Sequence, residues 1–275
     1  MIYNVDIGIV ETRKVIEVIK ETYNYDYKNY ALTFFKHRLE RVIEINNLRD
    51  IELLIQKLKT DQEFFEKFIQ DISVETTELF RDPSLWRLIR DDFLYKQTKI
   101  DGKYKIWVAG VQSGEELYSM AILIEESKLW DKVDITASYD SDFNLGLIRK
   151  GIFNLRKQEA NDANYRRFNC FSELTKYYKV VNNTGYWDTS LIKNVKFLKL
   201  NVTFDNSPKN FNLVWFRNQM LYFNQILQDY ILGVLYDSLV QGGYLVIGDK
   251  ETVEYSTYNK KLKLINDTEK VYKKI

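Results

Sequence analysis

The stretch VAGVQSGEELYSMAILIEES, residues 108–127, decides the fold of the region that contains it. The end of an apolar strand leads through a loop with Gly110 and Gly114 into a helical pattern. Strand–loop–helix units of this kind hold ligands at the carboxyl ends of parallel strands. Ser113 and Glu116 also form the Ser-x-x-Glu pattern of a helix capping box, which explains these two residues without a ligand. The capping interpretation leaves the two glycines unexplained.

The charge of this loop narrows the ligands that it could hold. The loop carries Glu115 and Glu116 and no basic residue. A phosphate loop uses bare amides with lysine or arginine, and a dinucleotide loop uses the spacing G-x-G-x-x-G, so both are disfavoured. S-adenosylmethionine carries a cationic sulfonium and an ammonium group but no phosphate, and it suits an acidic loop better. A methyl-donor loop and a simple helix cap both remain open at this point.

Beyond this loop, short apolar strands alternate with helical patterns. The predicted strands are YKIWVAG, VDITASY, NVKFLKLNV, FNLVWF and GGYLVIGD. This alternation predicts an α/β fold with a mainly parallel, doubly wound sheet. The ending LKLINDTEKVYKKI predicts a hairpin that closes the sheet. Residues 165–193 fit neither pattern and predict a small inserted subdomain or a long excursion of the chain.

The first 95 residues carry helical patterns only. Apolar residues recur at three- and four-residue spacing within residues 31–45 and again within residues 51–58. Thr60 and Glu63 predict a capping box at the start of a third helix. Pro83 is expected in the first turn of a further helix.

The composition bounds the classes of function. The chain has 275 residues, which is long enough for a large core or for two domains. Its net charge of +1 gives no reason to expect binding to nucleic acid or to membrane surfaces. One histidine, His37, argues against a histidine-ligated metal site and a Ser-His-Asp hydrolase, and one cysteine, Cys170, excludes an internal disulfide and a cysteine-based metal cluster. We interpret both residues as structural. Neither a signal peptide nor an apolar run of about 18 residues is present, so we expect a cytoplasmic protein without membrane insertion.

Several motifs, taken in order, carry a resemblance to a known family. They are TTELFRDPSLW (76–86), AGVQSGEELYS (109–119), FRNQMLYF (216–223) and LVQGGYLVIGDKE (239–251), and the N-terminal pattern YDYKNYALTFFKHRLERV (25–42) joins them. Together they resemble the CheR-type protein-glutamate O-methyltransferases, which methylate chemotaxis receptors. The resemblance covers nearly the whole chain.

The resemblance implies a domain plan and a partner. It implies a helical N-terminal domain in residues 1–95 and a Rossmann-like methyltransferase domain in residues 96–275, with an antiparallel β-subdomain inserted at about 165–198. The partner would be the cytoplasmic domain of a methyl-accepting receptor or a similar signalling protein. We expect a monomer that does not bind nucleic acid. A basic face of the N-terminal domain would approach that receptor, although a solvated helix face explains the same residues. This face comprises Lys28, Lys36, Arg38 and Arg41.

The resemblance also assigns site residues. The positions that match donor contacts are Thr77, Arg81, Gly110, Glu115, Asp140, Asn201, Val202, Arg217 and Asn218. Arg81 and Tyr222 match residues beside the methyl-transfer centre, where the arginine would orient the acceptor carboxylate and the tyrosine would fix its second oxygen. Several of these residues also have a structural alternative. Arg81 could form a surface ion pair, and Arg217 and Asn218 could end a strand. Asn201 could be a turn residue, and Tyr222 could be a core aromatic.

The implied chemistry suits a chain with one histidine. A glutamate side chain has a pKa of about 4.3 and is ionised at neutral pH, so its attack on a sulfonium methyl requires no general base. Alignment of the reactants can supply roughly 7–11 kcal/mol of the barrier. The products would be a glutamate methyl ester and S-adenosylhomocysteine, and no metal is required.

Three positions depart from the family pattern. Tyr139 stands where the family has an acidic residue for the donor ribose, and Asp140 follows it, so a one-residue bulge would be needed to bring Asp140 to the ribose. Glu75 replaces a frequent asparagine, and Val111-Gln112-Ser113 replaces Cys-Ser-Thr. Two alternatives therefore stand beside receptor methylation. One is a module that binds signalling partners without catalysis, and the other is a methyltransferase that acts on a small molecule or another protein.

Overall fold

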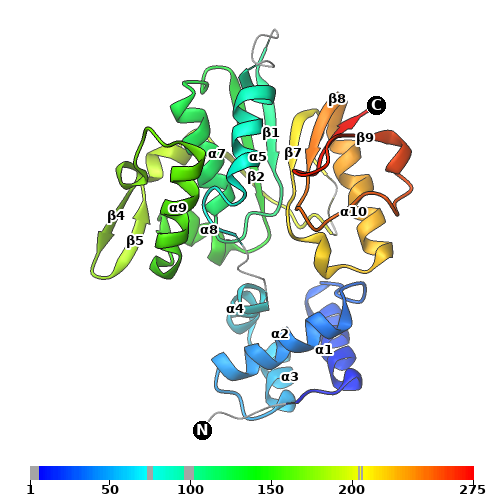
Figure 1. The fold of residues 1–275 in the computed structure, drawn as a ribbon. Coiled ribbons are helices and arrows are strands. Elements are labelled where there is room, and N and C mark those ends of the chain that lie inside the picture. Colours follow the sequence, from blue (N-terminus) through cyan, green and yellow to red (C-terminus); the bar gives the residue numbers. More distant parts are fainter. Residues whose placement is uncertain (1–5, 73–76, 96–101, 204, 206) are drawn as a thin grey trace.

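The computed structural model describes residues 6–72, 77–95, 102–203, 205 and 207–275, so the departure noted at Glu75 lies outside the described residues. An all-helical N-terminal part lies beside an α/β domain (Figure 1). No helix of the described residues combines the length and the apolar character that a membrane crossing needs.

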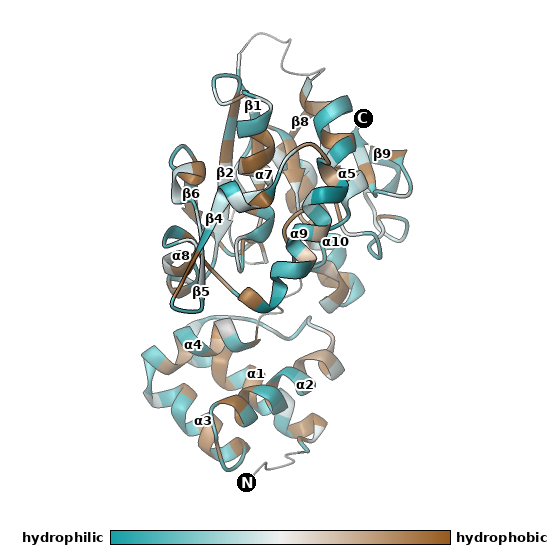
Figure 2. Cartoon of the chain, turned by 60° about the vertical axis from the view of Figure 1, so that its left-hand side comes forward, coloured by the Kyte–Doolittle hydropathy of each residue, from teal (hydrophilic) through white to brown (hydrophobic). Residues whose placement is uncertain are grey.

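Four amphipathic helices form the N-terminal part. They are α1 (Ile9–Tyr23), α2 (Leu32–Ile45), α3 (Ile51–Thr60) and α4 (Gln62–Ile72). Hydrophobic and hydrophilic segments alternate along each of them (Figure 2), and the hydrophobic residues share one core. The predicted capping box at Thr60 is wrong. Asp61 accepts the N–H of Phe64 at 2.9 Å, whereas the Thr60 hydroxyl donates back to the Gln56 carbonyl.

A seven-stranded sheet forms the centre of the α/β domain. Its strands, in spatial order, are β6 (Lys196–Lys199), β2 (Val133–Tyr139), β1 (Tyr104–Val108), β7 (Phe211–Trp215), β8 (Leu239–Val246), β10 (Val271–Lys274) and β9 (Leu262–Asn266). The first five run parallel, and β10 is antiparallel to both of its neighbours. The predicted doubly wound sheet and its closing hairpin are confirmed.

Helices cover both faces of this sheet because the central strands are apolar on both sides. The helices are α5 (Pro83–Leu88), α7 (Glu115–Glu126), α8 (Asp142–Arg149), α9 (Gln158–Phe168) and α10 (Gln225–Ser238). In β1, Ile106 and Val108 pack with α5 and α7, whereas Trp107 between them joins α10. Pro83 occupies the first turn of α5, as predicted, and a π-helix (Ile89–Leu94) follows. These two helices pack into the core of the α/β domain.

A second, three-stranded antiparallel sheet has the order β3 (Ile152–Phe153), β5 (Thr184–Trp187) and β4 (Tyr178–Val181). Its extent differs from the predicted subdomain of about 165–198. It begins with β3, which at two residues is too short to give an alternating pattern. The predicted end of the subdomain falls in β6, which pairs with β2 in the large sheet.

Candidate active site

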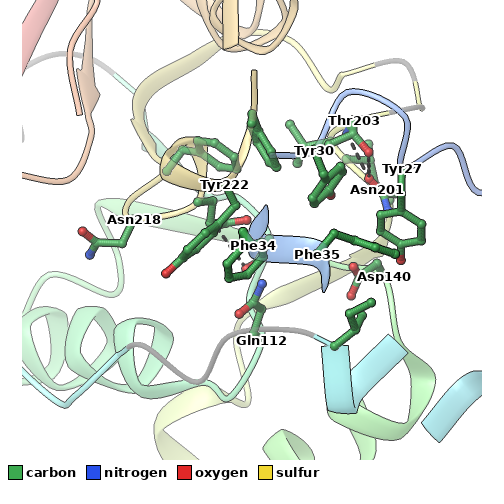
Figure 3. A pocket seen from close by; sticks show the side chains of 17 residues that line it. Tyr27, Tyr30, Phe34, Phe35, Gln112, Asp140, Asn201, Thr203, Asn218 and Tyr222 are labelled. Atoms are coloured by element: carbon green, nitrogen blue, oxygen red, sulfur yellow. Dashed lines mark hydrogen bonds between the residues drawn. The ribbon is translucent and has the colours of Figure 1, made fainter. Parts of the chain in front are cut away.

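A cavity lies between the carboxyl ends of the parallel strands and the helical N-terminal part (Figure 3). Gly110, Asp140 and Asn218 line it from the loops that follow β1, β2 and β7. Tyr30 and Phe34 line it from the N-terminal part. We call it the main cavity. Its position is the one where doubly wound sheets bind their ligands.

A second cavity adjoins the first along the loop after β1. Gly110 and Gln219 line both cavities, and Thr77, Glu116 and Arg217 line the second. The shared residues show that both cavities border the loop after β1.

The glycines of this loop allow its close packing. Gly110 has φ +69°, and a Cβ atom there would lie 2.7 Å from the Gln219 side-chain oxygen. Gly114, with φ +91°, directly precedes α7. The predicted capping box of Ser113 and Glu116 is wrong. The Ser113 hydroxyl donates to the Glu115 carboxylate, and α7 begins without a side-chain cap.

Two residues predicted to contact the donor, Thr77 and Glu115, lie together in the structure. The buried Glu115 carboxylate accepts hydrogen bonds from the Thr77 hydroxyl at 3.0 Å, from Lys157 Nζ at 3.2 Å and from the Ser113 hydroxyl. Because these groups surround its carboxylate, Glu115 is not among the residues that line either cavity.

Glu116 and Arg217 face the second cavity. Arg217 Nη1 lies 3.4 Å from a Glu116 carboxylate oxygen, and its Nη2 pairs with the Asp82 carboxylate. Burial raises the pKa of Glu116, and the charge of Arg217 opposes that rise. The capping pattern assigned Glu116 to the start of a helix, so its place in the cavity was not predicted. The available signal was the pair of adjacent glutamates, because neighbouring residues at a helix start point in different directions.

Asp140 reaches the main cavity without a bulge in β2. The pairings of β2 with β1 and with β6 run in regular register to the end of the strand. Tyr139 packs against the hydrophobic core, and the chain bends at Asp140, which lines the cavity. Burial raises the pKa of the Asp140 carboxyl, although hydrogen bonds from its own amide and from that of Ser141 oppose the rise.

Asn201 and Val202 follow β6 and also line the main cavity. The Asn201 side-chain oxygen accepts a hydrogen bond from the N–H of Thr203 at 2.9 Å and another from its hydroxyl (Figure 3). The structure therefore uses this oxygen within a turn, as the structural alternative predicted, and places the turn at the edge of the cavity.

The loop after β7 is held by a residue that sequence reasoning did not assign. Glu251 is buried, and its carboxylate accepts the N–H groups of Gly248 at 2.6 Å, Met220 at 2.7 Å and Asn218 at 3.0 Å. Asn218 has φ +58°, a conformation that asparagine tolerates better than most residues. Its buried Nδ2 has no hydrogen-bond partner among the described residues. Asn218 lines the main cavity, and its buried amide nitrogen is an unsatisfied donor in the loop beside that cavity.

Tyr222 lines the main cavity, whereas Arg81 is not among the residues that line either one. Burial raises the pKa of the Tyr222 phenol, and the charges of Arg38 and Arg81 oppose that rise. Arg81 Nε lies 3.9 Å from an Asp82 carboxylate oxygen. The structure thus places Tyr222 on the main cavity and Arg81 beside Asp82.

Comparisons with known proteins agree with this architecture. Residues 11–73 match the CheR methyltransferase all-alpha domain, and residues 75–271 match the CheR methyltransferase SAM binding domain. A provisionally named methyltransferase, Cher3, of Pseudomonas putida is 29% identical over 96% of this chain and 97% of its own length. The chemotaxis protein methyltransferase of Listeria innocua is 25% identical over 86% of this chain and 87% of its own length. That of Borreliella burgdorferi is 25% identical over 91% and 92%, respectively. The chain therefore belongs to the CheR methyltransferase family.

Proposed function

We propose that this protein transfers a methyl group from S-adenosylmethionine to glutamate side chains in the cytoplasmic domain of a methyl-accepting chemotaxis-type receptor. The relatives named chemotaxis protein methyltransferase support the class of acceptor. The observation that carries the proposal is the main cavity, where Asp140, Asn218 and Tyr222 line one space.

The residues of the two cavities fit S-adenosylmethionine. In the main cavity, Asp140 offers a carboxylate for ribose hydroxyls, and the side chains of Leu200 and Val202 offer an apolar wall for a planar base. In the second cavity, Glu116 offers a negative charge for the ammonium group of the donor. When bound, S-adenosylmethionine supplies a methyl group on a positively charged sulfur.

The protein's own contribution is mainly positioning. A glutamate carboxylate of the receptor is ionised at neutral pH and needs no base. We infer that Arg81 orients this carboxylate through its guanidinium group and that the Tyr222 hydroxyl donates to the oxygen that does not attack. These contacts align the acceptor without protonating it, so its attacking lone pair stays available.

The experiment begins with calorimetric titration of S-adenosylhomocysteine into the purified protein and into the matched variants Glu116→Gln and Glu115→Gln. We expect micromolar binding to the unchanged protein and a loss of at least about tenfold for Glu116→Gln, because a buried charged hydrogen bond contributes roughly 1.5–3 kcal/mol. Glu115→Gln should have the smaller effect, since Glu115 lines neither cavity. 5′-Methylthioadenosine lacks the amino-acid tail, so Glu116→Gln should leave its affinity unchanged.

The second arm measures transfer of labelled methyl groups to receptor cytoplasmic fragments. Glutamate methyl esters release methanol in mild alkali, whereas methylated nitrogen does not. Alkali-labile label supports the proposal, and alkali-stable label would contradict the acceptor. Transfer to a small metabolite but not to the fragments would point to the other acceptor class.

One observation favours a second candidate, a partner-binding module without catalysis. Gln219 Nε2 donates to the carbonyls of Ala109 at 3.1 Å and Gly110 at 3.3 Å, and its side chain occupies the boundary between the two cavities. An S-adenosylmethionine molecule that occupies both cavities would have to pass the Gln219 side chain, which would weaken its binding. Failure of millimolar S-adenosylhomocysteine to bind a folded sample would favour this second candidate.

A further inference from the structure

The helical N-terminal part is fastened directly to the loop that carries Tyr222. The N–H of Ala31 donates to the Tyr222 carbonyl at 2.8 Å, and the N–H of Asn224 donates to the Asn29 carbonyl at 2.8 Å. The Asn224 side-chain amide also donates to the Asn29 side-chain oxygen at 3.1 Å. Two segments almost two hundred residues apart in sequence thus form a short antiparallel bridge.

The same contact brings an aromatic side chain of α2 onto Tyr222. The Phe34 and Tyr222 rings are stacked, with centroids 4.0 Å apart and planes inclined by 24°. Both rings line the main cavity (Figure 3). Within the described part of the chain, no hydrogen bond reaches the Tyr222 hydroxyl. The direction of this ring therefore depends on packing, and Phe34 provides its stacking partner.

The backbone of α2 fixes the position of Phe34. The next residue, Phe35, is 1% exposed and belongs to the core of the helical part. One turn after Phe34, Arg38 donates to the backbone carbonyls of Asp71 and Ile72 at the end of α4. Arg38 is also close enough to oppose the rise in the pKa of Tyr222. One face of α2 therefore shapes the surroundings of the phenol.

We propose that Phe34 is a positioning residue, which holds the Tyr222 ring at the angle needed for its hydroxyl to contact the acceptor carboxylate. The helical part is then a component of the active site as well as a neighbouring domain. This inference rests on the proposed function, because it assigns Phe34 a role in methyl transfer through Tyr222.

The test compares Phe34→Leu, which keeps an apolar side chain but removes the ring, with Phe34→Tyr, which keeps the ring. Phe143→Leu on α8 is the control, since Phe143 is exposed and lines neither cavity. Each protein carries 3-fluorotyrosine at position 222, and its ¹⁹F resonance is recorded with and without S-adenosylhomocysteine. Receptor-fragment methylation then gives kcat and KM, and urea denaturation verifies that each variant folds.

For Phe34→Leu we expect a shifted ¹⁹F resonance and a kcat, measured at saturating S-adenosylmethionine, lowered about tenfold, which is equivalent to ~1.4 kcal/mol in the barrier. Phe34→Tyr should restore the resonance and most of the rate. An unchanged resonance and kcat in Phe34→Leu would overturn the inference. If the unchanged protein neither binds S-adenosylhomocysteine nor transfers methyl groups, the proposed function fails, whereas the ¹⁹F comparison still reports whether Phe34 positions the ring.

Discussion

The Asp140 carboxylate lowers the stability of the ligand-free protein. A ligand that donates hydrogen bonds to this carboxylate would offset the loss. Burial raises the pKa of its carboxyl, so folding at neutral pH is opposed by the loss of hydration around an ionised group. The sign follows from linkage. A raised pKa in the folded state favours folding below the ordinary carboxyl pKa, and this favourable contribution is lost as pH rises through the folded-state value.

Replacing Asp140 with asparagine should therefore stabilise the ligand-free protein at pH 7 and weaken S-adenosylhomocysteine binding. The gain in stability should shrink as pH falls towards the ordinary carboxyl pKa. Urea denaturation at several pH values, together with calorimetric titration, measures both effects. Asp131→Asn, at an exposed position, is the control and should change neither quantity. A less stable Asp140→Asn protein at pH 7 would contradict the argument.

Some residues of the candidate site could be predicted from the sequence, and others could not. The family motifs led to Asp140 and Asn218, and both line the main cavity. They assigned Glu115 to the donor, whereas Glu116 lines the second cavity and Lys157, from a segment far along the chain, binds the Glu115 carboxylate. Long-range contacts of this kind depend on the tertiary fold, which local patterns do not encode.

At the scale of elements, the loop after β7 depends on the carboxylate of Glu251 in the loop after β8. Glu251→Ala would leave the buried N–H groups of Gly248, Asn218 and Met220 without an acceptor. Each unsatisfied buried donor costs roughly 1–3 kcal/mol, so we expect the free energy of unfolding to fall by about 3 kcal/mol or more. Urea denaturation measures this loss. The exposed Glu254→Ala change should alter stability by less than about 0.5 kcal/mol, and a similar effect for both variants would refute the role of Glu251.

Elements with strong periodicity were predictable, and those defined by distant partners were not. The apolar runs that form β1 and β7 and the hairpin of β9 and β10 follow from local patterns. The two residues of β3 gain their strand geometry only by pairing with β5. Likewise, α5 and the following π-helix have helical patterns, but their packing with the α/β core depends on large buried residues such as Trp86, which contacts Trp215.

At the scale of the whole molecule, the main cavity lies between the helical N-terminal part and the α/β domain. Tyr30 and Phe34 belong to the helical part, whereas Asp140 and Asn218 belong to the α/β domain, and all four line the same space. A ligand that contacts both sides stabilises the arrangement in which they are together. Ligand binding should therefore slow hydrogen exchange in the lining residues of the helical part as well as in the loops that follow the strands.

Hydrogen exchange measured by mass spectrometry tests this coupling. At about 100 times its dissociation constant, S-adenosylhomocysteine adds roughly 2.7 kcal/mol to global stability. We expect slower exchange in peptides that cover residues 27–35 as well as in those that cover the loop after β1. Peptides from α3 give the internal comparison because α3 lines neither cavity. In these peptides the ligand should slow exchange only at amides that exchange through global unfolding. Protection confined to the α/β domain would show that the ligand does not engage the aromatic wall, and the helical part would then contribute only to contacts with the acceptor.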